Sequence, residues 1–114
     1  MAATEAELSS SVDRVVLDEI VRRIVVSARP LRIVLFGSAA RGTMGRDSDV
    51  DVLVVVPDGV PIRATSQDLH VRMAGVSVPV DIVVATPAVL ERYANSRGLI
   101  YREALRDGRE LYAA

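Results

Sequence analysis

Cysteine is absent from the 114-residue sequence, and histidine occurs once, at His70. The lack of cysteine excludes disulfides, thiol nucleophiles and metals held by thiolates. With no second histidine and no cysteine to join it, His70 is a poor candidate for a metal ligand. We expect it at the protein surface or at the boundary of the core.

Lysine is also missing, so all 14 basic residues are arginine, and against 15 acidic residues they leave a formal net charge of -1. This balance argues against a general binding surface for nucleic acid or for a membrane. No apolar run is long enough to span a bilayer, and the acidic start of the chain lacks the basic-then-apolar pattern of a signal peptide. We therefore expect one soluble, cytoplasmic domain over residues 1–114.

Apolar periodicity and turn residues divide the chain into alternating helices and strands. The pattern predicts strands at 31–36, 48–56 and 78–85, a helical turn at 38–41, and helices that end near Ala28, run from Pro61 to near Gly75, begin at Thr86-Pro87 and run over 99–106. This order predicts an α/β (α+β) fold. We expect a small mixed sheet of three or more strands with helices packed mainly on one face.

The first predicted helix has a wide apolar surface. It begins at Ser10 or Ser11 and carries two adjacent apolar rows, Val12, Val16, Ile20 and Ile24 in one, and Leu17, Val21 and Val25 in the other. Such a helix is either well buried against its own sheet or partly available for homo-oligomer or hetero-oligomer formation.

Two aspartates share one face of the second predicted strand. Side chains alternate along a strand, so Asp49 and Asp51 point to one side while Val50 points to the other. Two unpaired carboxylates at close range repel by about 4 kcal/mol at an effective dielectric constant of roughly 20. A divalent cation relieves this repulsion, and oxygen ligands favour Mg²⁺ over zinc. Asp81, an isolated carboxylate in the apolar third strand, also requires a partner.

A glycine and a serine follow the first predicted strand. The Gly37-Ser38 turn leads into a helical turn, where backbone N–H groups point outward and glycine lets a phosphate approach the main chain. Arg41 and Arg46 are nearby cations that can offset phosphate charge, although a salt bridge to a neighbouring aspartate explains Arg41 equally well. Phosphates on the turn and Mg²⁺ on the aspartates together describe one site for a nucleoside triphosphate.

The stretch 37–51, which reads Gly-Ser, ten residues, then Asp-x-Asp, resembles the signature of the polymerase-beta-type nucleotidyltransferase superfamily. More narrowly, it resembles the minimal nucleotidyltransferases, the MNT proteins that are paired as antitoxins with HEPN-domain toxins. The strand at 80–83 and the closing segment 101–112 are similar to that family as well.

The resemblance implies a nucleotidyltransferase fold with a defined role for each motif residue. Gly37 and Ser38 hold the β and γ phosphates of ATP in such a site. The resemblance also implies two Mg²⁺ ions bound by Asp49, Asp51 and Asp81, with Asp81 helping to deprotonate the attacking hydroxyl.

The length of the chain narrows the expected acceptor. Larger relatives append a helical domain that helps to bind substrate, and 114 residues leave no room for one. The leading hypothesis is therefore AMP transfer from ATP to a hydroxyl, with tyrosine expected, of a cognate HEPN toxin. Two other hypotheses remain open, a non-catalytic antitoxin that inhibits the toxin by binding and an aminoglycoside-type enzyme that modifies a small molecule.

Overall fold

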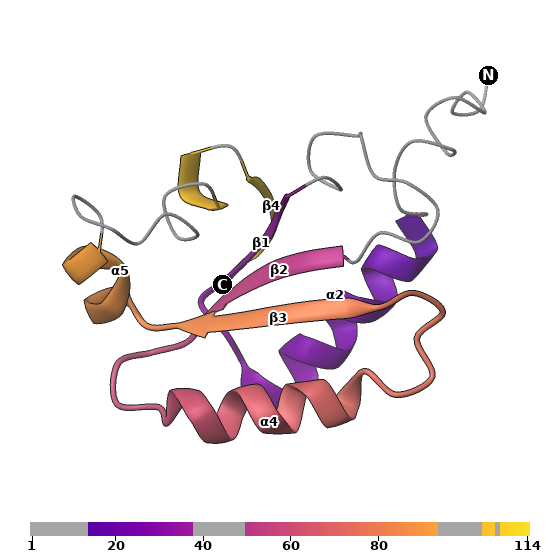
Figure 1. Ribbon diagram of the computed structural model, residues 1–114, viewed down its shortest axis with the longest axis horizontal. Helices are drawn as coiled ribbons and strands as arrows, with labels where there is room; N and C mark the ends of the chain where they lie inside the picture. The colour runs from indigo at the N-terminus through magenta and orange to yellow at the C-terminus, as the bar shows by residue number, and fades with distance from the viewer. Residues whose placement is uncertain (1–13, 38–49, 94–103, 107) are drawn as a thin grey trace.

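The computed structural model describes residues 14–37, 50–93, 104–106 and 108–114, which form a four-stranded sheet with helices packed against it (Figure 1). In chain order its elements are α2 (Arg14–Ala28), β1 (Arg32–Phe36), β2 (Val50–Val55), α4 (Ile62–Arg72), β3 (Val80–Ala85), α5 (Pro87–Tyr93) and β4 (Arg109–Ala113). Residues 104–106 add one helical turn ahead of β4. This arrangement confirms the predicted α/β (α+β) class.

The strands are ordered β3-β2-β1-β4 across a mixed sheet. β2 runs parallel to β3 and antiparallel to β1, and β1 runs antiparallel to β4. Parallel neighbours need a long crossover connection, which α4 provides between β2 and β3. The three predicted strands correspond to β1, β2 and β3, which lack one or two of the described residues of each prediction, and the predicted residues 48–49 lie outside the described residues. β4 does not appear in the sequence-based prediction.

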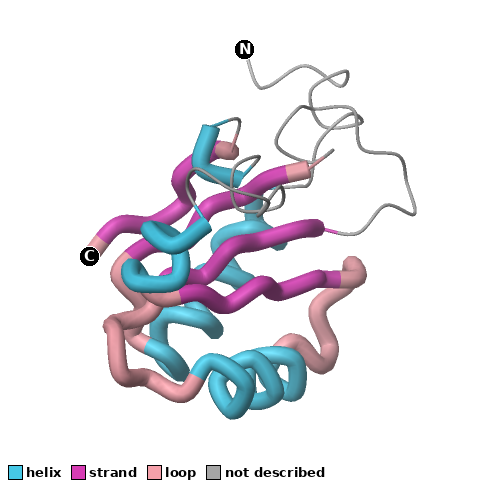
Figure 2. The backbone as a smooth tube through the Cα atoms, turned by 60° about the vertical axis from the view of Figure 1, so that its left-hand side comes forward, coloured by secondary structure: helices cyan, strands magenta, loops and turns pink. Residues whose placement is uncertain are grey.

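Helices α2 and α4 lie side by side against one face of the sheet (Figures 1 and 2). The main core lies between them and the strands. Its members from the two helices and the C-cap of α4 are Leu17, Ile20, Ile24, Leu69 and Met73. Those from the strands and the residue after β2 are Ile33, Leu35, Val50, Val52, Val54, Val56, Ile82 and Val84.

The two apolar rows of α2 are used by this core. Leu17, Ile20 and Ile24 are buried, and the described remainder of both rows packs against them. Among the large apolar residues of α2, only Val15 and Val26 expose most of their surface, and both lie off these rows. The helix is therefore of the well-buried kind, and its predicted start at Ser10 or Ser11 lies outside the described residues.

A smaller cluster covers the opposite face of the sheet. Its buried members are Val34, Phe36, Leu53, Val55, Ala85 and Ala104, and Val89 and Leu90 of α5 pack against it. Gly108 closes the turn before β4, because its N–H donates to the carbonyl of Ala104 at 3.0 Å and a Cβ there would clash with that carbonyl and with Val34. The glycine predicted to end the helix over 99–106 thus follows the helical turn at 104–106, and the predicted residues 99–103 lie outside the described residues.

Helix α4 begins at the proline from which the sequence predicts a helix. Pro61 is its N-cap residue, and the helix ends at Arg72 with Met73 as C-cap, slightly before the predicted end near Gly75. His70 is exposed on this helix, in agreement with the predicted position at the surface or at the core boundary. Within the described ranges no helix has the length and apolar character needed to cross a membrane.

Candidate functional site

Asp51 and Asp81 lie directly opposite each other on the parallel strands β2 and β3. Their chain neighbours Val50, Val52 and Ile82 belong to the core under α2 and α4. Because side chains alternate along a strand, the two aspartates share the other face of the sheet. Asp51 is half-buried and Asp81 is exposed, so the pair marks the boundary between the smaller core cluster and solvent.

Gly37 approaches Asp51 more closely than any residue with a side chain could. It directly follows Phe36, the β1 residue that pairs with Asp51. An ideal Cβ on Gly37 would lie 2.5 Å from Oδ2 of Asp51, and the backbone there has φ +73°, in the left-handed region. Both facts select glycine, because other residues pay a steric penalty at this φ and would collide with the carboxylate.

These three residues mark one end of the sheet. β1 ends at Phe36, and because it is antiparallel to β2, its end lies beside the start of β2. β3 is parallel to β2, so its start lies at the same end. Gly37, Asp51 and Asp81, which are 14 to 44 residues apart in the sequence, thus bring a backbone without a side chain and two carboxylates to neighbouring strand ends.

The described part of this site fits a divalent cation. Two carboxylates directly opposite on adjacent strands repel unless a cation or a proton lies between them. Their oxygens are the ligands that Mg²⁺ takes, and the exposure of Asp81 leaves that side open. Among the described residues there is no cluster of three or more acidic, histidine or cysteine side chains.

The structure brings together three of the residues predicted to form the site, Gly37, Asp51 and Asp81. Asp51 and Asp81 lie in strands, and Gly37 lies in a turn directly after a strand, as expected. The other four predicted site residues, Ser38, Arg41, Arg46 and Asp49, lie outside the described residues.

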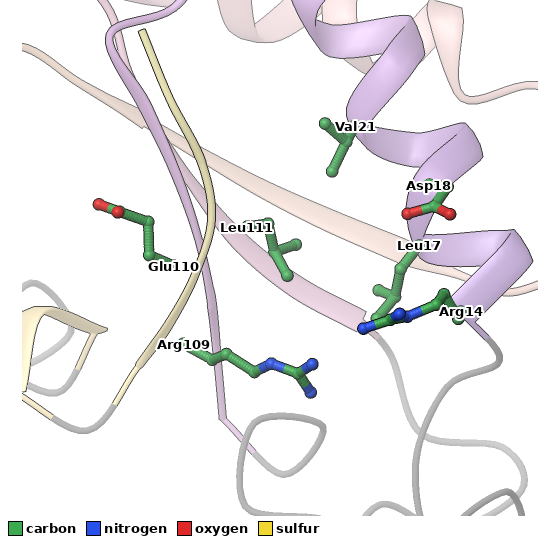
Figure 3. Close-up of a pocket in the computed structure, with 7 residues that line it drawn as sticks. All are labelled: Arg14, Leu17, Asp18, Val21, Arg109, Glu110 and Leu111. Carbon is green, nitrogen blue, oxygen red and sulfur yellow. The ribbon is translucent and has the colours of Figure 1, made fainter. Parts of the chain in front are cut away.

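A feature that the sequence pattern did not indicate is a groove between α2 and β4 (Figure 3). It has a volume of about 260 Å³, and arginines from both elements, Arg14 and Arg109, extend into it. Only the assignment of 109–113 as a strand could have revealed it. That five-residue segment begins with two charged residues and does not show the apolar alternation of a buried strand.

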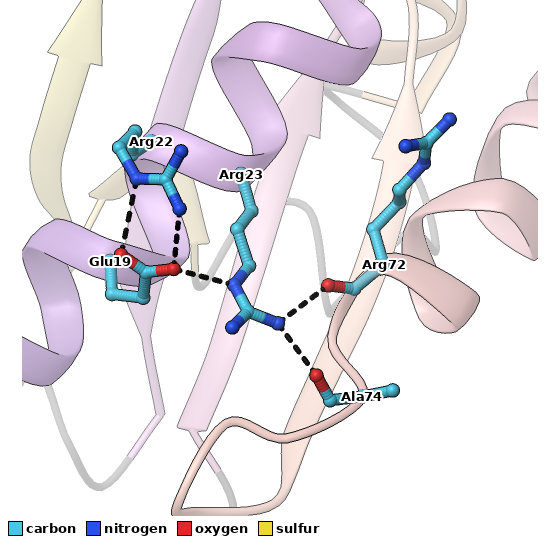
Figure 4. Close-up of polar contacts among 5 residues, drawn as sticks. All are labelled: Glu19, Arg22, Arg23, Arg72 and Ala74. Atoms are coloured by element: carbon cyan, nitrogen blue, oxygen red, sulfur yellow. Dashed lines mark hydrogen bonds and ion pairs between the residues drawn. The ribbon is translucent and has the colours of Figure 1, made fainter.

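A polar joint connects α2 to the end of α4 (Figure 4). Arg23 donates hydrogen bonds to the backbone carbonyls of Arg72 and Ala74, at 2.9 and 2.7 Å. Glu19 accepts from Arg23 at 2.7 Å and from Arg22 at 2.6 Å. These bonds, first that from Arg22 and then that from Arg23, lower the pKa of Glu19 from 4.5 to about 2.

Most of the chain matches the model of one known protein family. The model of the nucleotidyltransferase domain matches residues 16–110. This range contains all of the predicted site residues. A search of curated proteins found no match.

Solved structures with the same fold include a putative nucleotidyltransferase and toxin-antitoxin structures. A putative nucleotidyltransferase from Sulfolobus solfataricus has 20% identity and a TM-score of 0.65, over 99% of this chain and 92% of that one. A toxin-antitoxin structure with AMP-PNP has 22% identity and a TM-score of 0.57, over 85% of this chain and 73% of that one. A tri-AMPylated Shewanella oneidensis HEPN toxin in complex with an MNT antitoxin gives 16% identity and a TM-score of 0.52, over 89% of this chain and 72% of that one.

Proposed function

Because the chain belongs to the nucleotidyltransferase domain family, we propose that it transfers AMP from ATP to a hydroxyl of a HEPN-domain toxin and thereby acts as its antitoxin. The observation that carries this proposal is the meeting of Gly37, Asp51 and Asp81 at one end of the sheet. A nucleotidyl transfer site needs both a close backbone approach for phosphates and paired carboxylates for metal.

The triphosphate would be held at the turn after β1. Gly37 and Ser38 bind the β and γ phosphates, and Arg41 and Arg46 offset their charge. The absence of a side chain at Gly37 supports this role, because it lets the backbone of the turn lie directly against the Asp51 carboxylate that would hold the metal. The bound phosphates and the carboxylates would then lie on adjacent strand ends.

The acidic residues would hold Mg²⁺ and prepare the acceptor. Asp49, Asp51 and Asp81 are the ligands for two ions, which when bound neutralise charge on the triphosphate and on the leaving pyrophosphate. The acceptor oxygen forms a bond to the α-phosphorus while the bond from that phosphorus to the bridging oxygen of the β phosphate breaks. Asp81, which is exposed, receives the hydroxyl proton, and pyrophosphate leaves.

Two structural neighbours support the choice of donor and acceptor. One is a toxin-antitoxin with AMP-PNP, and the other is a HEPN toxin that carries AMP groups and is bound to an MNT antitoxin. By analogy, ATP is the donor here and a toxin hydroxyl, with tyrosine expected, is the acceptor. This reaction belongs in the cytoplasm, where ATP and an intracellular toxin are available.

The test is transfer of label from α-labelled ATP to the toxin in the presence of Mg²⁺. Label should appear on the toxin with the wild-type protein and should be lost with Asp51→Asn. The control is Asp68→Asn, which removes the same charge on α4, away from the site, and should retain transfer.

The same experiment separates the two competing hypotheses. An unlabelled toxin that is inhibited equally well by wild-type protein and by Asp51→Asn would indicate inhibition by binding alone. That hypothesis drew on the apolar rows of α2, which the chain's own core occupies. Label transferred to a soluble hydroxylated compound, with no protein acceptor present, would indicate a small-molecule enzyme.

A further inference from the structure

The α2–β4 groove has an apolar floor and a charged rim (Figure 3). The floor is formed by Leu17 and Val21 of α2 and Leu111 of β4. Its volume of about 260 Å³ is below the range of roughly 300–1,000 Å³ that is usual for small-molecule sites. The groove is therefore better suited to side chains of a bound polypeptide than to a cofactor.

Among the described strands, β4 leaves one side of its backbone unpaired along this groove. β4 is the last of the described strands, paired on one side only, with β1. Ala114 donates its N–H to the carbonyl of Leu31, on the β1 side. Since neighbouring residues of a strand direct their N–H and C=O to opposite sides, Ala113 directs its groups to the open side. This alternation does not extend to Leu111, because the pairing of β4 with β1 shifts register between Ile33 and Val34. An open edge of this kind can pair with an added strand.

The charges at the rim favour an acidic partner. Arg14 and Arg109 extend toward each other across the groove, and no hydrogen bond or ion pair is found for either within the described ranges. Of the two acids that line the groove, Glu110 points away and pairs with Arg32 at 2.7 Å, which leaves Asp18 alone against two guanidinium groups. A net positive rim over an apolar floor matches an extended segment that alternates acidic and apolar residues.

The α2–β4 groove begins at the end of the sheet that holds the candidate site. Arg109, at the start of β4, pairs with Leu35 near the end of β1. Gly37 follows two residues after Leu35, so the start of β4 lies at the same end of the sheet as Gly37 and Asp51. A segment bound along β4 would run toward that end.

We propose that an extended, acidic segment of the acceptor protein adds to the open edge of β4, with apolar side chains in the α2–β4 groove and carboxylates at Arg14 and Arg109. The identity of the partner as the acceptor rests on the proposed function. The mode of binding does not require nucleotide or metal. Docking at this edge would hold the acceptor protein while its hydroxyl reaches the nucleotide site.

A peptide titration of the full chain tests this mode of binding without ATP or Mg²⁺, so that its failure is distinct from a failure of AMP transfer. The probes are the end-blocked peptides Glu-Val-Glu-Val-Glu and Lys-Val-Lys-Val-Lys, followed by backbone amide NMR signals. The acidic peptide should cause saturable shifts at Leu111 and Ala113 and bind about tenfold more tightly than the basic one. No saturable shift in β4, or equal binding of both peptides, would overturn the proposal.

Charge reversal at the rim gives the sharper comparison. Arg14→Glu combined with Arg109→Glu should reverse the preference in favour of the basic peptide. The control combines Arg63→Glu and Arg92→Glu, which change the net charge equally on α4 and α5 and should keep the acidic preference. Reversal by the control pair as well would mean that net charge, and not the groove, selects the peptide, and would contradict the proposal.

The backbone contribution is tested by Ala113→Pro. Proline removes an N–H that points to the open side and is tolerated on an edge strand. Both peptides should bind several-fold more weakly while the dispersion of the NMR spectrum shows that the chain remains folded. Unchanged peptide affinity in the folded variant would exclude strand addition.

Discussion

The backbone of Gly37 and the carboxylate of Asp51 are so close that no side chain fits between them. An ideal Cβ on Gly37 lies 2.5 Å from Oδ2 of Asp51, and φ at Gly37 is +73°. A glycine in a strand-to-loop turn often serves only the turn. Here the glycine also allows the Asp51 carboxylate to lie against the main chain, next to the turn where a phosphate is proposed to bind.

Replacing Gly37 by alanine should therefore cost more stability than its backbone conformation alone explains. Gly59 provides the control, because it has φ +93° but nothing within 4 Å of an added Cβ. Gly59→Ala should lower the free energy of unfolding by about 1 kcal/mol and Gly37→Ala by about 2–4 kcal/mol, as measured in urea. Equal losses for the two variants would mean that Asp51 moves aside freely.

Removal of one carboxylate should stabilise the protein without metal and abolish its response to Mg²⁺. Asp81→Asn relieves the repulsion from Asp51 on the adjacent strand, which is worth up to about 1 kcal/mol. Mg²⁺ should raise the melting temperature of the wild-type protein, because it binds the folded state, and should have little effect on Asp81→Asn. Thermal unfolding with and without Mg²⁺ measures both effects, and a full Mg²⁺ response in Asp81→Asn would exclude that residue as a ligand.

The joint between α2 and α4 should depend on Arg23 and not on Arg22. Arg23 exposes 26% of its side chain and donates to two backbone carbonyls at the end of α4, whereas Arg22 exposes 63% and, within the described ranges, forms its hydrogen bonds with Glu19. Arg23→Ala should lower the free energy of unfolding by about 2 kcal/mol, and Arg22→Ala should change it much less, because solvent screens its exposed ion pair. Urea denaturation of the two variants tests this, and similar losses would show that the joint contributes nothing.

Glu19 should make the protein sensitive to acid. Its pKa is lowered from 4.5 to about 2 in the folded protein by the bonds from Arg22 and Arg23. Because the folded pKa is the lower one, the stabilisation is fully present above about pH 4.5 and is lost as the pH falls toward 2. The difference in stability between wild-type protein and Glu19→Gln should therefore be constant above that window and shrink within it. A difference that does not change with pH would contradict the assigned pairing.

Much of the fold and part of the candidate site follow from local patterns in the sequence. The strands β1, β2 and β3 have apolar, β-branched sequences bounded by turn residues, and strict alternation puts Asp51 on one face. What alternation cannot give is register, because pairing depends on contacts between distant segments. The alignment of Asp51 with Asp81, and of both with the end of β1, became visible only in the sheet.

The edge strand β4 shows the limit of such patterns. Its sequence, Arg109–Ala113, is short and begins with charged residues that also suit an exposed helix. It becomes a strand because β1 presents a free edge and Leu111 and Tyr112 pack against the main core. The place of Arg109 on the rim of the α2–β4 groove depends on this pairing and could not be predicted from the sequence.

The central claim is that Gly37, Asp51 and Asp81 belong to an AMP-transfer site that acts on a toxin. Its most direct measurement is the mass of the HEPN toxin after incubation with ATP, Mg²⁺ and this protein, in parallel with Asp51→Asn and the control Asp68→Asn. The account predicts a mass increase of one or more AMP groups with wild-type protein and with Asp68→Asn, and none with Asp51→Asn. An unmodified toxin in all three reactions, or equal modification by Asp51→Asn, would contradict it.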